Sequence, residues 1–307
     1  MKVKMNEPGN DKDITANSAG KREETINMKL AIAVVLYQPD DSVLDNILSY
    51  INLTERLYVI DNSVSPVSII DKLKKYPQVT YISMGGNKGI ASALNAGIFQ
   101  AMQENFTHLM TMDQDSRFQQ SVFMGYIQKA DDIFNATQNA AIVGINYDGY
   151  KQKNQKADVE VVEEVITSGM IINLDIMKKL GSFIEKLFID YVDYEYCYRA
   201  RKAGYLCFIV NQYRLEHQIG GMNPIVKYGI HFRNHNEHNA IRQYYMARNA
   251  IYVMINYPDM AMKWVKNLIK SPIKILLVDD DKGKKFRGYI SGIFDGIRGQ
   301  YGPKTSL

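Results

Sequence analysis

Cysteine is scarce in this chain of 307 residues, which contains only Cys197 and Cys207. Their positions fit no disulfide or metal-ligand spacing, so we expect two free, buried thiols. No apolar run reaches the roughly 18 residues that a membrane-spanning helix requires, and the N-terminal residues lack the apolar segment of a secretory signal. These absences favour a cytoplasmic protein.

The chain also has little excess of positive over negative charge. Its net charge of +4 is too small to indicate a nucleic-acid binder. Hydrophobic residues make up 46% and charged residues 23%, and the length suits one sizeable domain with an appendage, or two domains. Residues 1–27 have no apolar period and are rich in polar residues, so we expect a flexible polar extension there.

Apolar runs of strand length alternate with segments of helical periodicity after this extension. The expected strands cover residues 29–37, 56–62, 79–84, 108–113 and 140–146, followed by 159–166. Long helical connections between strands favour a doubly wound α/β fold, with a mostly parallel sheet flanked by helices. Ligands of such sheets bind at the carboxyl ends of the strands.

Acidic residues follow two of these strands. Asp61 and Asn62 end one strand, and Asp113 and Asp115 end another. Residues i and i+2 of an extended chain point to the same side, so Asp113 and Asp115 can face one hard cation such as Mg²⁺ or Mn²⁺. A solvated, Asp-rich turn is the alternative interpretation.

Glycines interrupt the chain before the next helical segment, in "GGNKGIASALNAGI" at residues 85–98. Glycines before a helix can let main-chain N–H groups approach a phosphate. Their spacing matches neither the dinucleotide-binding nor the ATP-binding loop, so a tight turn with close helix packing is an equally good explanation.

A second group of acids, Asp190, Asp193 and Glu195, lies among aromatic and aliphatic residues. Acids suit the first turn of a helix, which would explain one or two of them. Carboxylates in such surroundings are costly without a partner or a catalytic task. The segment is therefore a candidate for a general base.

Six short segments occur in an order that resembles one enzyme family: "AVVLYQPD", "VIDNS", "GNKGIASALNAGI", "MDQDS", "TSGMIIN" and "FIDYVDYEYCYRARKAGY". Together they resemble glycosyltransferase family 2, inverting nucleotide-sugar enzymes of GT-A fold, and are most similar to bacterial dTDP-rhamnosyltransferases of O-antigen and capsule synthesis. The resemblance covers about residues 29–255. It implies a GT-A domain at 28–238, with a nucleotide-binding half (28–146) and an acceptor and catalytic half (147–238), before a C-terminal amphipathic helical region at 239–307.

The resemblance implies roles for the residues at matching positions. The donor-binding residues would be Tyr37, Asp61, Asn62, Asn87, Lys88, Asp113 and Arg248. Asp61 would bind the pyrimidine base, and Asn87 and Lys88 would lie beside the nucleotide. A divalent cation, Mg²⁺ or Mn²⁺, would be held by Asp113, Asp115 and His217. It would neutralise charge on the leaving diphosphate.

Asp193 matches the catalytic base, which would take the proton of an acceptor hydroxyl as that hydroxyl displaces the diphosphate with inversion. Asp190, Glu195 and Arg199 would support the acceptor side. Val192 stands where the family usually has Glu, and Asp190 is the candidate to replace that acid.

The histidines and an Arg-Asn pair can each be interpreted in more than one way. A lone histidine after a strand, such as His217, is more often structural than a metal ligand when the resemblance is set aside. A zinc site made of His231, His235 and His238 competes with a polar loop as the default. Arg248 and Asn249 match an Arg-Asn pair that would either clamp a loop over the donor or serve packing.

Lysines and apolar residues interleave in the C-terminal stretch 262–299. Basic amphipathic segments of this kind can lie on an anionic membrane surface, and a saccharide acceptor carried on a polyprenyl lipid would give the protein a reason to do so. Packing of the same apolar residues in the core, or a homodimer interface, explains the pattern equally well.

Two other functions remain open. A donor other than dTDP-rhamnose, such as UDP-galactofuranose, UDP-glucose or UDP-N-acetylglucosamine, would suit the same residue pattern. The second alternative is a noncatalytic scaffold subunit that binds a nucleotide sugar, although the presence of Asp113, Asp115 and Asp193 argues against it.

Overall fold

The computed structural model describes residues 26–65, 67–147, 157–217, 223–227, 230–235 and 238–304. Most of the extension predicted at residues 1–27 lies outside these ranges. Close to the first described residue, the main-chain amides of Asn27 and Met28 donate to the buried carboxylate of Asp131 at 3.0 and 2.9 Å. The start of the folded part is therefore tied to helix α4 (Gln120–Ala136).

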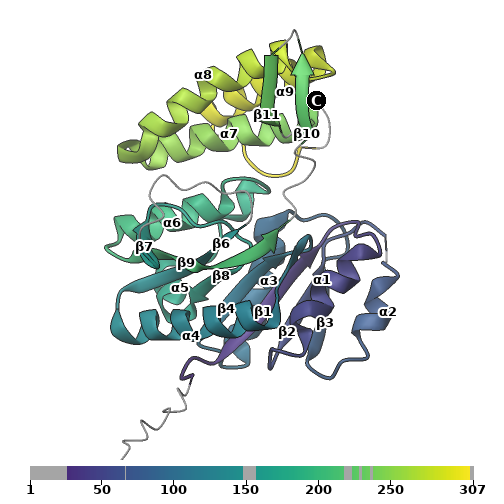
Figure 1. The fold of residues 1–307 in the computed structure, drawn as a ribbon. Coiled ribbons are helices and arrows are strands. Elements are labelled where there is room, and N and C mark those ends of the chain that lie inside the picture. The colour runs from purple at the N-terminus through teal and green to yellow at the C-terminus, as the bar shows by residue number, and fades with distance from the viewer. Residues whose placement is uncertain are drawn as a thin grey trace, which may run out of the picture.

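A mixed β-sheet forms the centre of the molecule (Figure 1). Its strands are β1 (Leu30–Leu36), β2 (Leu57–Asp61), β3 (Val79–Ser83), β4 (His108–Asp113), β5 (Ser116–Arg117), β6 (Ala140–Tyr147), β7 (Val159–Val162), β8 (Met170–Asn173) and β9 (Leu206–His217). They are ordered β3-β2-β1-β4-β8-β6-β9-β5, and β7 pairs with β9. A separate antiparallel pair, β10 (Asn223–Lys227) and β11 (Ile230–His235), follows.

The parallel half of the sheet confirms the α/β prediction. Strands β3, β2, β1 and β4 pair in parallel, so their carboxyl ends meet at one edge. Strand β8 departs from the expected pattern because it is inserted antiparallel between β4 and β6. Its four residues are too few to show a strand period in the sequence. The strand expected over 159–166 also ends early, at Val162.

Helices cover both faces of the sheet, and β1 is therefore buried on both sides. Ile32 and Val34 face the cluster formed with α1 (Ser42–Ile51), α2 (Ile69–Leu73) and α4. Ala31 and Ala33 face the cluster formed with α3 (Ile90–Gln103), α5 (Leu174–Leu180) and α6 (Val192–Lys202). Small residues let α3 come close, since a Cβ at Gly97 would lie 3.1 Å from that of Ala33. The alternation of side chains along one strand thus places two helical layers.

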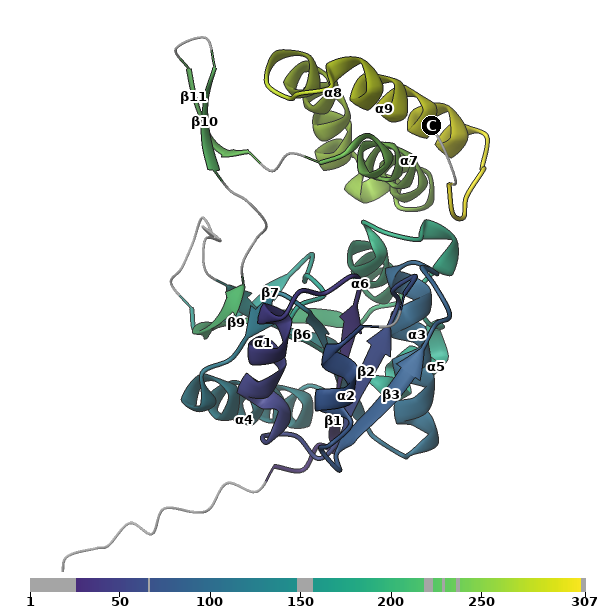
Figure 2. The same cartoon turned by 90° about the vertical axis from the view of Figure 1, so that its right-hand side faces the viewer.

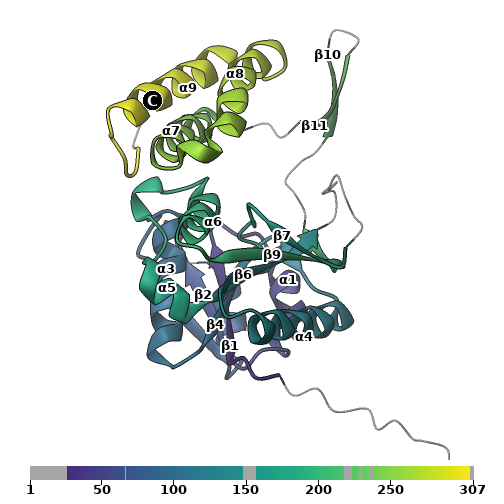
Figure 3. The same cartoon turned by 90° about the vertical axis from the view of Figure 1, so that its left-hand side faces the viewer.

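Helices α7 (Ala240–Asn256), α8 (Ala261–Leu277) and α9 (Lys282–Ile297) form a further layer beyond α6 (Figures 2 and 3). Short 3₁₀ turns, Glu185–Leu187 and Pro258–Met260, precede α6 and α8. Val253 of α7 and Trp264 of α8 belong to the same hydrophobic cluster as Tyr196 of α6. The regions predicted on either side of residue 238 therefore share one core.

Two smaller predictions can be compared directly with the structure. Cys197 and Cys207 are both buried and free, as expected. None of the described helices is long and apolar enough to cross a membrane.

Candidate active site

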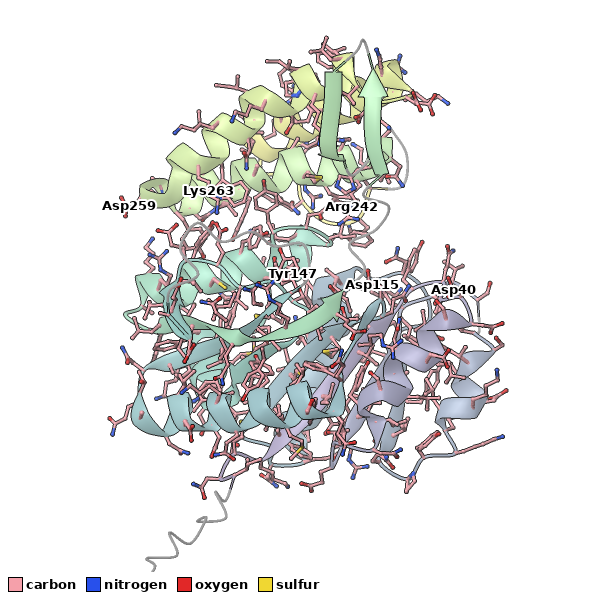
Figure 4. The ribbon with its side chains drawn as sticks, in the orientation of Figure 1. Asp40, Asp115, Tyr147, Arg242, Asp259 and Lys263 are labelled. Carbon is pink, nitrogen blue, oxygen red and sulfur yellow. The ribbon has the colours of Figure 1, made fainter. Side chains whose placement is uncertain are left out.

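A cavity of about 1070 Å³ lies between the carboxyl ends of the strands and the helical layer. Its walls come from the ends of β1, β2 and β4, the segments 164–167 and 188–194, and one side each of α7 and α8. Figure 4 shows Arg242 on the helical side, with Asp115 and Tyr147 at the edge of the sheet below it. The cavity thus occupies the position in which open α/β sheets bind their ligands.

The acidic loop after β4 is fixed by its middle residue. The Gln114 carboxamide oxygen accepts a hydrogen bond from the Tyr37 amide at 2.8 Å, and its nitrogen donates to the Tyr37 carbonyl at 3.3 Å. Asn46 of α1 donates to the Gln114 carbonyl at 3.0 Å. Asp113 and Asp115, on either side of Gln114, both line the cavity together with Tyr37. The loop therefore holds two carboxylates where a ligand in the cavity can meet them.

The glycine-containing loop is joined to the end of β2 by two asparagines. Asn62 donates from Nδ2 to Oδ1 of Asn87 at 3.2 Å and accepts the Lys88 amide at 2.7 Å. Asn62 and Asn87 line the cavity. The Lys88 side chain is exposed and lies outside the lining. Of these three predicted donor-binding residues, the structure brings two to the cavity.

Asp61 ends β2 but is directed away from the lining. Its carboxylate accepts hydrogen bonds from the Ser63 amide and the Tyr81 hydroxyl, both at 3.0 Å. Asp61 is buried, so these two donors satisfy a carboxylate that would otherwise be costly to desolvate. Its predicted contact with a pyrimidine base stays a prediction.

Asp193 lies in the first turn of α6 and lines the cavity. One carboxylate oxygen accepts the amide and the hydroxyl of Thr167, at 3.1 and 3.3 Å, and the other accepts the Tyr194 amide at 2.9 Å. Burial, helped by the negative charge of Asp113, raises the pKa of Asp193 to about 7, although the amide donors oppose the shift. A carboxylate with this pKa can exchange a proton near neutral pH.

Asp190 and Arg242 form an ion pair in the cavity wall. The Arg242 guanidinium donates to Oδ1 of Asp190 at 3.0 Å, and the negative charge raises the pKa of Arg242. Asp190 has a left-handed backbone, with φ of 62°. Sequence reasoning missed Arg242, because nothing local indicates that residue 242 will face residue 190.

Glu195 and Arg199, which were expected to support the acceptor side, lie outside the cavity lining. The buried Glu195 forms an ion pair at 2.9 Å with the half-buried Arg199, which also donates to the carbonyls of Leu180, Gly181 and Ser182, each at 2.8 Å. The pair joins α6 to the end of α5 behind the cavity wall, and its expected support of the acceptor side stays a prediction.

Arg248 was predicted to bind the donor, but its side chain is fully buried outside the cavity lining. The lining face of α7 comprises Gln243, Met246, Ala247 and Ala250. Arg248 points elsewhere and donates to the carbonyls of Leu187 and Gly302 at 2.8 and 2.6 Å. The packing alternative thus describes it better, because it ties the 187–191 segment to the C-terminal part of the chain.

Of the histidines considered as metal ligands, the structure describes the side chain of His238. The backbone of His217 pairs with Ser116 across β9 and β5, next to Asp115 in the sequence, but its side chain lies outside the described residues. The side chains of His231 and His235 also lie outside them. His238 lines the cavity, where burial lowers its pKa.

Aromatic and charged side chains line the cavity on the side of α8, and sequence analysis assigned them no role. The Trp264 ring lies 4.5 Å from that of Tyr191 and 5.6 Å from that of Tyr194, measured between centroids. Lys263 forms an ion pair with Glu164, and burial raises the pKa of Glu164. Because these residues come from three separate segments of the chain, no local pattern in the sequence predicts their contact. They give the cavity a polar and aromatic wall beyond Asp193.

The carboxylates at the cavity supply part of the ligands that a divalent cation needs. Asp113 and Asp115 supply hard oxygen ligands of the kind that Mg²⁺ and Mn²⁺ accept. Among the side chains that the structure describes, no three His, Cys, Asp or Glu gather into a complete metal site. Ligands beyond the two carboxylates would have to come from a bound substrate, from water or from His217.

Comparisons with known proteins agree with this picture. The chain is 26% identical over 296 residues to a dTDP-rhamnosyl transferase, RfbF of Shigella flexneri, covering 89% of this chain and 97% of the relative. It resembles the crystal structure of S. aureus TarS 1-349 in complex with UDP-GlcNAc, with a TM-score of 0.57, 13% identity, and coverage of 88% of this chain and 81% of that one.

A second solved structure is GalNAc-T7 with UDP, GalNAc and Mn²⁺, with a TM-score of 0.55 and 15% identity. That match covers 85% of this chain and 54% of GalNAc-T7, so the chain spans about half of that protein. These likenesses confirm the predicted GT-A type of α/β fold. The family model for glycosyl transferase family 2 matches residues 32–187, just over half of the sequence. By fold, by the position of its acidic cavity and by this match, the chain belongs to glycosyl transferase family 2.

Proposed function

We propose that this protein transfers a hexose, L-rhamnose from dTDP-rhamnose, to a saccharide acceptor in the synthesis of a bacterial surface polysaccharide. The observation that carries the proposal is that one cavity is lined by Asp113 and Asp115 at the strand ends and by Asp193, a carboxyl group of near-neutral pKa. Similarity to a rhamnosyl transferase over most of both chains supports the choice of donor.

In this proposal the donor diphosphate would lie at the strand ends, where Asp113 and Asp115, with His217 as a further candidate, would hold a divalent cation, Mg²⁺ or Mn²⁺. When bound, such a cation stabilises the negative charge that develops on the leaving diphosphate. Asn62 and Asn87 would bind the nucleotide, and Tyr37 would cover it. Arg242 would add positive charge from the helical side, where its partner Asp190 keeps it oriented.

Asp193 would act as the base. It would accept the proton of an acceptor hydroxyl while the hydroxyl oxygen bonds to the anomeric carbon and the bond to the diphosphate breaks on the opposite face, which inverts the configuration. The Thr167 and Tyr194 donors hold the carboxylate in place.

The acceptor would enter from the α8 side. Tyr194 and Trp264 offer apolar ring surface for sugar rings, and Asn267 offers a hydrogen-bonding amide. We propose a saccharide carried on a polyprenyl lipid, with the enzyme in the cytoplasm and bound peripherally to the inner membrane surface.

Ligand-induced stabilisation tests the donor. The intact chain would be heated with dTDP, UDP or GDP, each with and without Mn²⁺ or Mg²⁺, since a ligand at about 100 times its dissociation constant stabilises by roughly 2.7 kcal/mol. A metal-dependent shift led by dTDP supports the proposal. A shift led by UDP keeps the enzyme class and changes the donor, whereas donor binding without any transfer would favour a scaffold subunit.

Asp115→Ala tests the metal site. This variant should lose the metal-dependent part of the shift, while Asp45→Ala, which removes an exposed carboxylate of α1, should keep it. An unchanged metal-dependent shift in Asp115→Ala would remove Asp115 from the proposed ligand set.

A further inference from the structure

Helix α8 has two apolar faces, of which one is packed. Trp264, Leu268 and Ile275 point inward, and Trp264 and Leu268 line the cavity. Four other apolar residues are exposed, with exposed fractions between 48% and 61%: Ile269, Ile273, Leu276 and Leu277. Their spacing of four, three and one residues places them along one side of the helix. Single exposed apolar residues are common, but a continuous stripe on one helix indicates a binding surface.

The charges of α8 indicate what that surface binds. The helix contains Lys263, Lys266, Lys270 and Lys274 and no acidic residue. Lys263 is paired with Glu164, whereas Lys266, Lys270 and Lys274 are exposed beside the apolar stripe. Ile273 and Leu277 lie three and seven residues after Lys270, on the same side of the helix. The surface is therefore both apolar and basic, which complements an anionic bilayer.

Helix α9 differs, because most of its apolar residues are packed and only Phe294 and Ile297, near its C-terminal end, are exposed among those that the structure describes. A Cβ at Gly292 would lie 2.2 Å from the Tyr244 carbonyl of α7, and Tyr289 is buried against the same helix layer. The basic and amphipathic stretch predicted at 262–299 thus divides into two parts. Core packing explains most of α9, and it leaves the outer face of α8 without explanation.

We infer that the outer face of α8, defined as Ile269, Ile273, Leu276 and Leu277 with Lys266, Lys270 and Lys274, binds an anionic membrane surface. Long lysine side chains can reach phosphate groups while the apolar residues enter the interface between headgroups and acyl chains. The inference deepens the proposed function, because the opposite face of α8 lines the cavity and would hold the acceptor side close to the bilayer.

Vesicle co-sedimentation tests this surface without any catalytic readout. The intact chain should sediment with vesicles of mixed phosphatidylglycerol and phosphatidylcholine, and binding should weaken with added salt and with pure phosphatidylcholine. Replacing Lys266, Lys270 and Lys274 by Gln should weaken binding on the order of 100-fold. Ile269→Gln with Ile273→Gln should weaken it by about tenfold or more. Phe99→Gln is the matched control, because Phe99 is an equally exposed apolar residue on α3, and it should bind as the parent does.

Two measurements on the same samples keep the outcome interpretable. Trp264 is the single tryptophan of the chain, so unchanged fluorescence in the variants shows that the inner face of α8 is still packed. Nucleotide-induced thermal shifts should also be unchanged, which separates this surface from the donor site. Equal binding to both kinds of vesicle, or variants that bind as the parent does, would overturn the inference. So would sedimentation velocity showing a dimer that the α8 variants convert to monomers.

Discussion

The Asn249 side chain donates a hydrogen bond to the main-chain carbonyl of Asp190, at 3.0 Å, from the middle of α7 to the wall of the cavity. The same amide group lies 2.7 Å from the carbonyl of Ile189 and 2.9 Å from that of Leu187. Phe188, Asp190 and Tyr191 all have positive φ, between 62° and 67°, which is unfavourable for residues with a Cβ. The segment that leads to Asp193 is thus held in a strained conformation by a buried amide.

Asn249→Ala should destabilise the protein by about 2–3 kcal/mol, because it leaves buried carbonyl groups without a donor. Urea unfolding measures this loss. Asn256→Ala is the matched control at the C-terminal end of α7, where the residue is exposed and its side chain donates to the Tyr252 carbonyl, and it should cost little. Equal effects from the two substitutions would mean that Asn249 does not hold the strained segment.

Asp193→Asn should keep donor binding and lose turnover by about 100- to 10 000-fold, because only the proton acceptor is removed. In the parent enzyme, kcat/KM should fall as the pH drops below about 7, the pKa of this carboxyl group. Transfer assays on the parent and the variant measure both effects. Near-normal transfer by Asp193→Asn would exclude Asp193 as the base.

The same residue links pH to stability in the metal-free protein. Since folding raises the pKa of Asp193 to about 7, its contribution to stability is present below its unfolded pKa and is lost as the pH rises through 7. Asp193→Asn should therefore be more stable than the parent at pH 8, and this advantage should shrink towards pH 4. Thermal unfolding across this range checks the sign, and an advantage that grew as the pH fell would contradict it.

Local pattern predicted the parallel half of the sheet and the acids at its edge, because strand period and topology suffice to place Asp113 and Asp115. It could not place residues whose role depends on the rotation of a helix about its axis. Arg248 faces the 187–191 segment, while Met246 and Ala247 face the cavity. Neighbouring residues of a helix point in different directions, so a small error in the rotation of α7 would assign Arg248 to the wrong side. The ion pairs of Arg242 with Asp190 and of Lys263 with Glu164 could not be predicted from local sequence patterns, since each joins segments far apart in the sequence.

Gly89→Ala should destabilise the protein by more than about 1 kcal/mol. Gly89 has φ of +87°, and a Cβ there would lie 2.6 Å from the Phe188 carbonyl oxygen, which accepts the Ile90 amide at 2.8 Å. Gly283→Ala is a control of opposite sign. Gly283 lies within α9 with open space around it, so added helix propensity should stabilise by about 0.5–1 kcal/mol. A stabilising Gly89→Ala would show that the loop after β3 moves freely past Phe188.

Helix α8 contains Pro272, which has no N–H to donate to the carbonyl of Leu268 four residues earlier. The Tyr289 hydroxyl of α9 donates to that carbonyl at 2.5 Å and replaces the missing helix hydrogen bond. Tyr289→Phe should therefore cost about 1–3 kcal/mol, as expected when a partly buried carbonyl loses its donor.

A double-mutant cycle separates this hydrogen bond from general packing. Pro272→Ala restores an amide donor to Leu268, so the cost of Tyr289→Phe should be smaller in the Pro272→Ala background, and urea unfolding of the four proteins gives the difference. If the cost is the same in both backgrounds, the Tyr289 hydroxyl does not compensate for the proline. A smaller cost would show that α9 keeps α8 continuous through residue 272, which both the cavity wall and the outer face of α8 require.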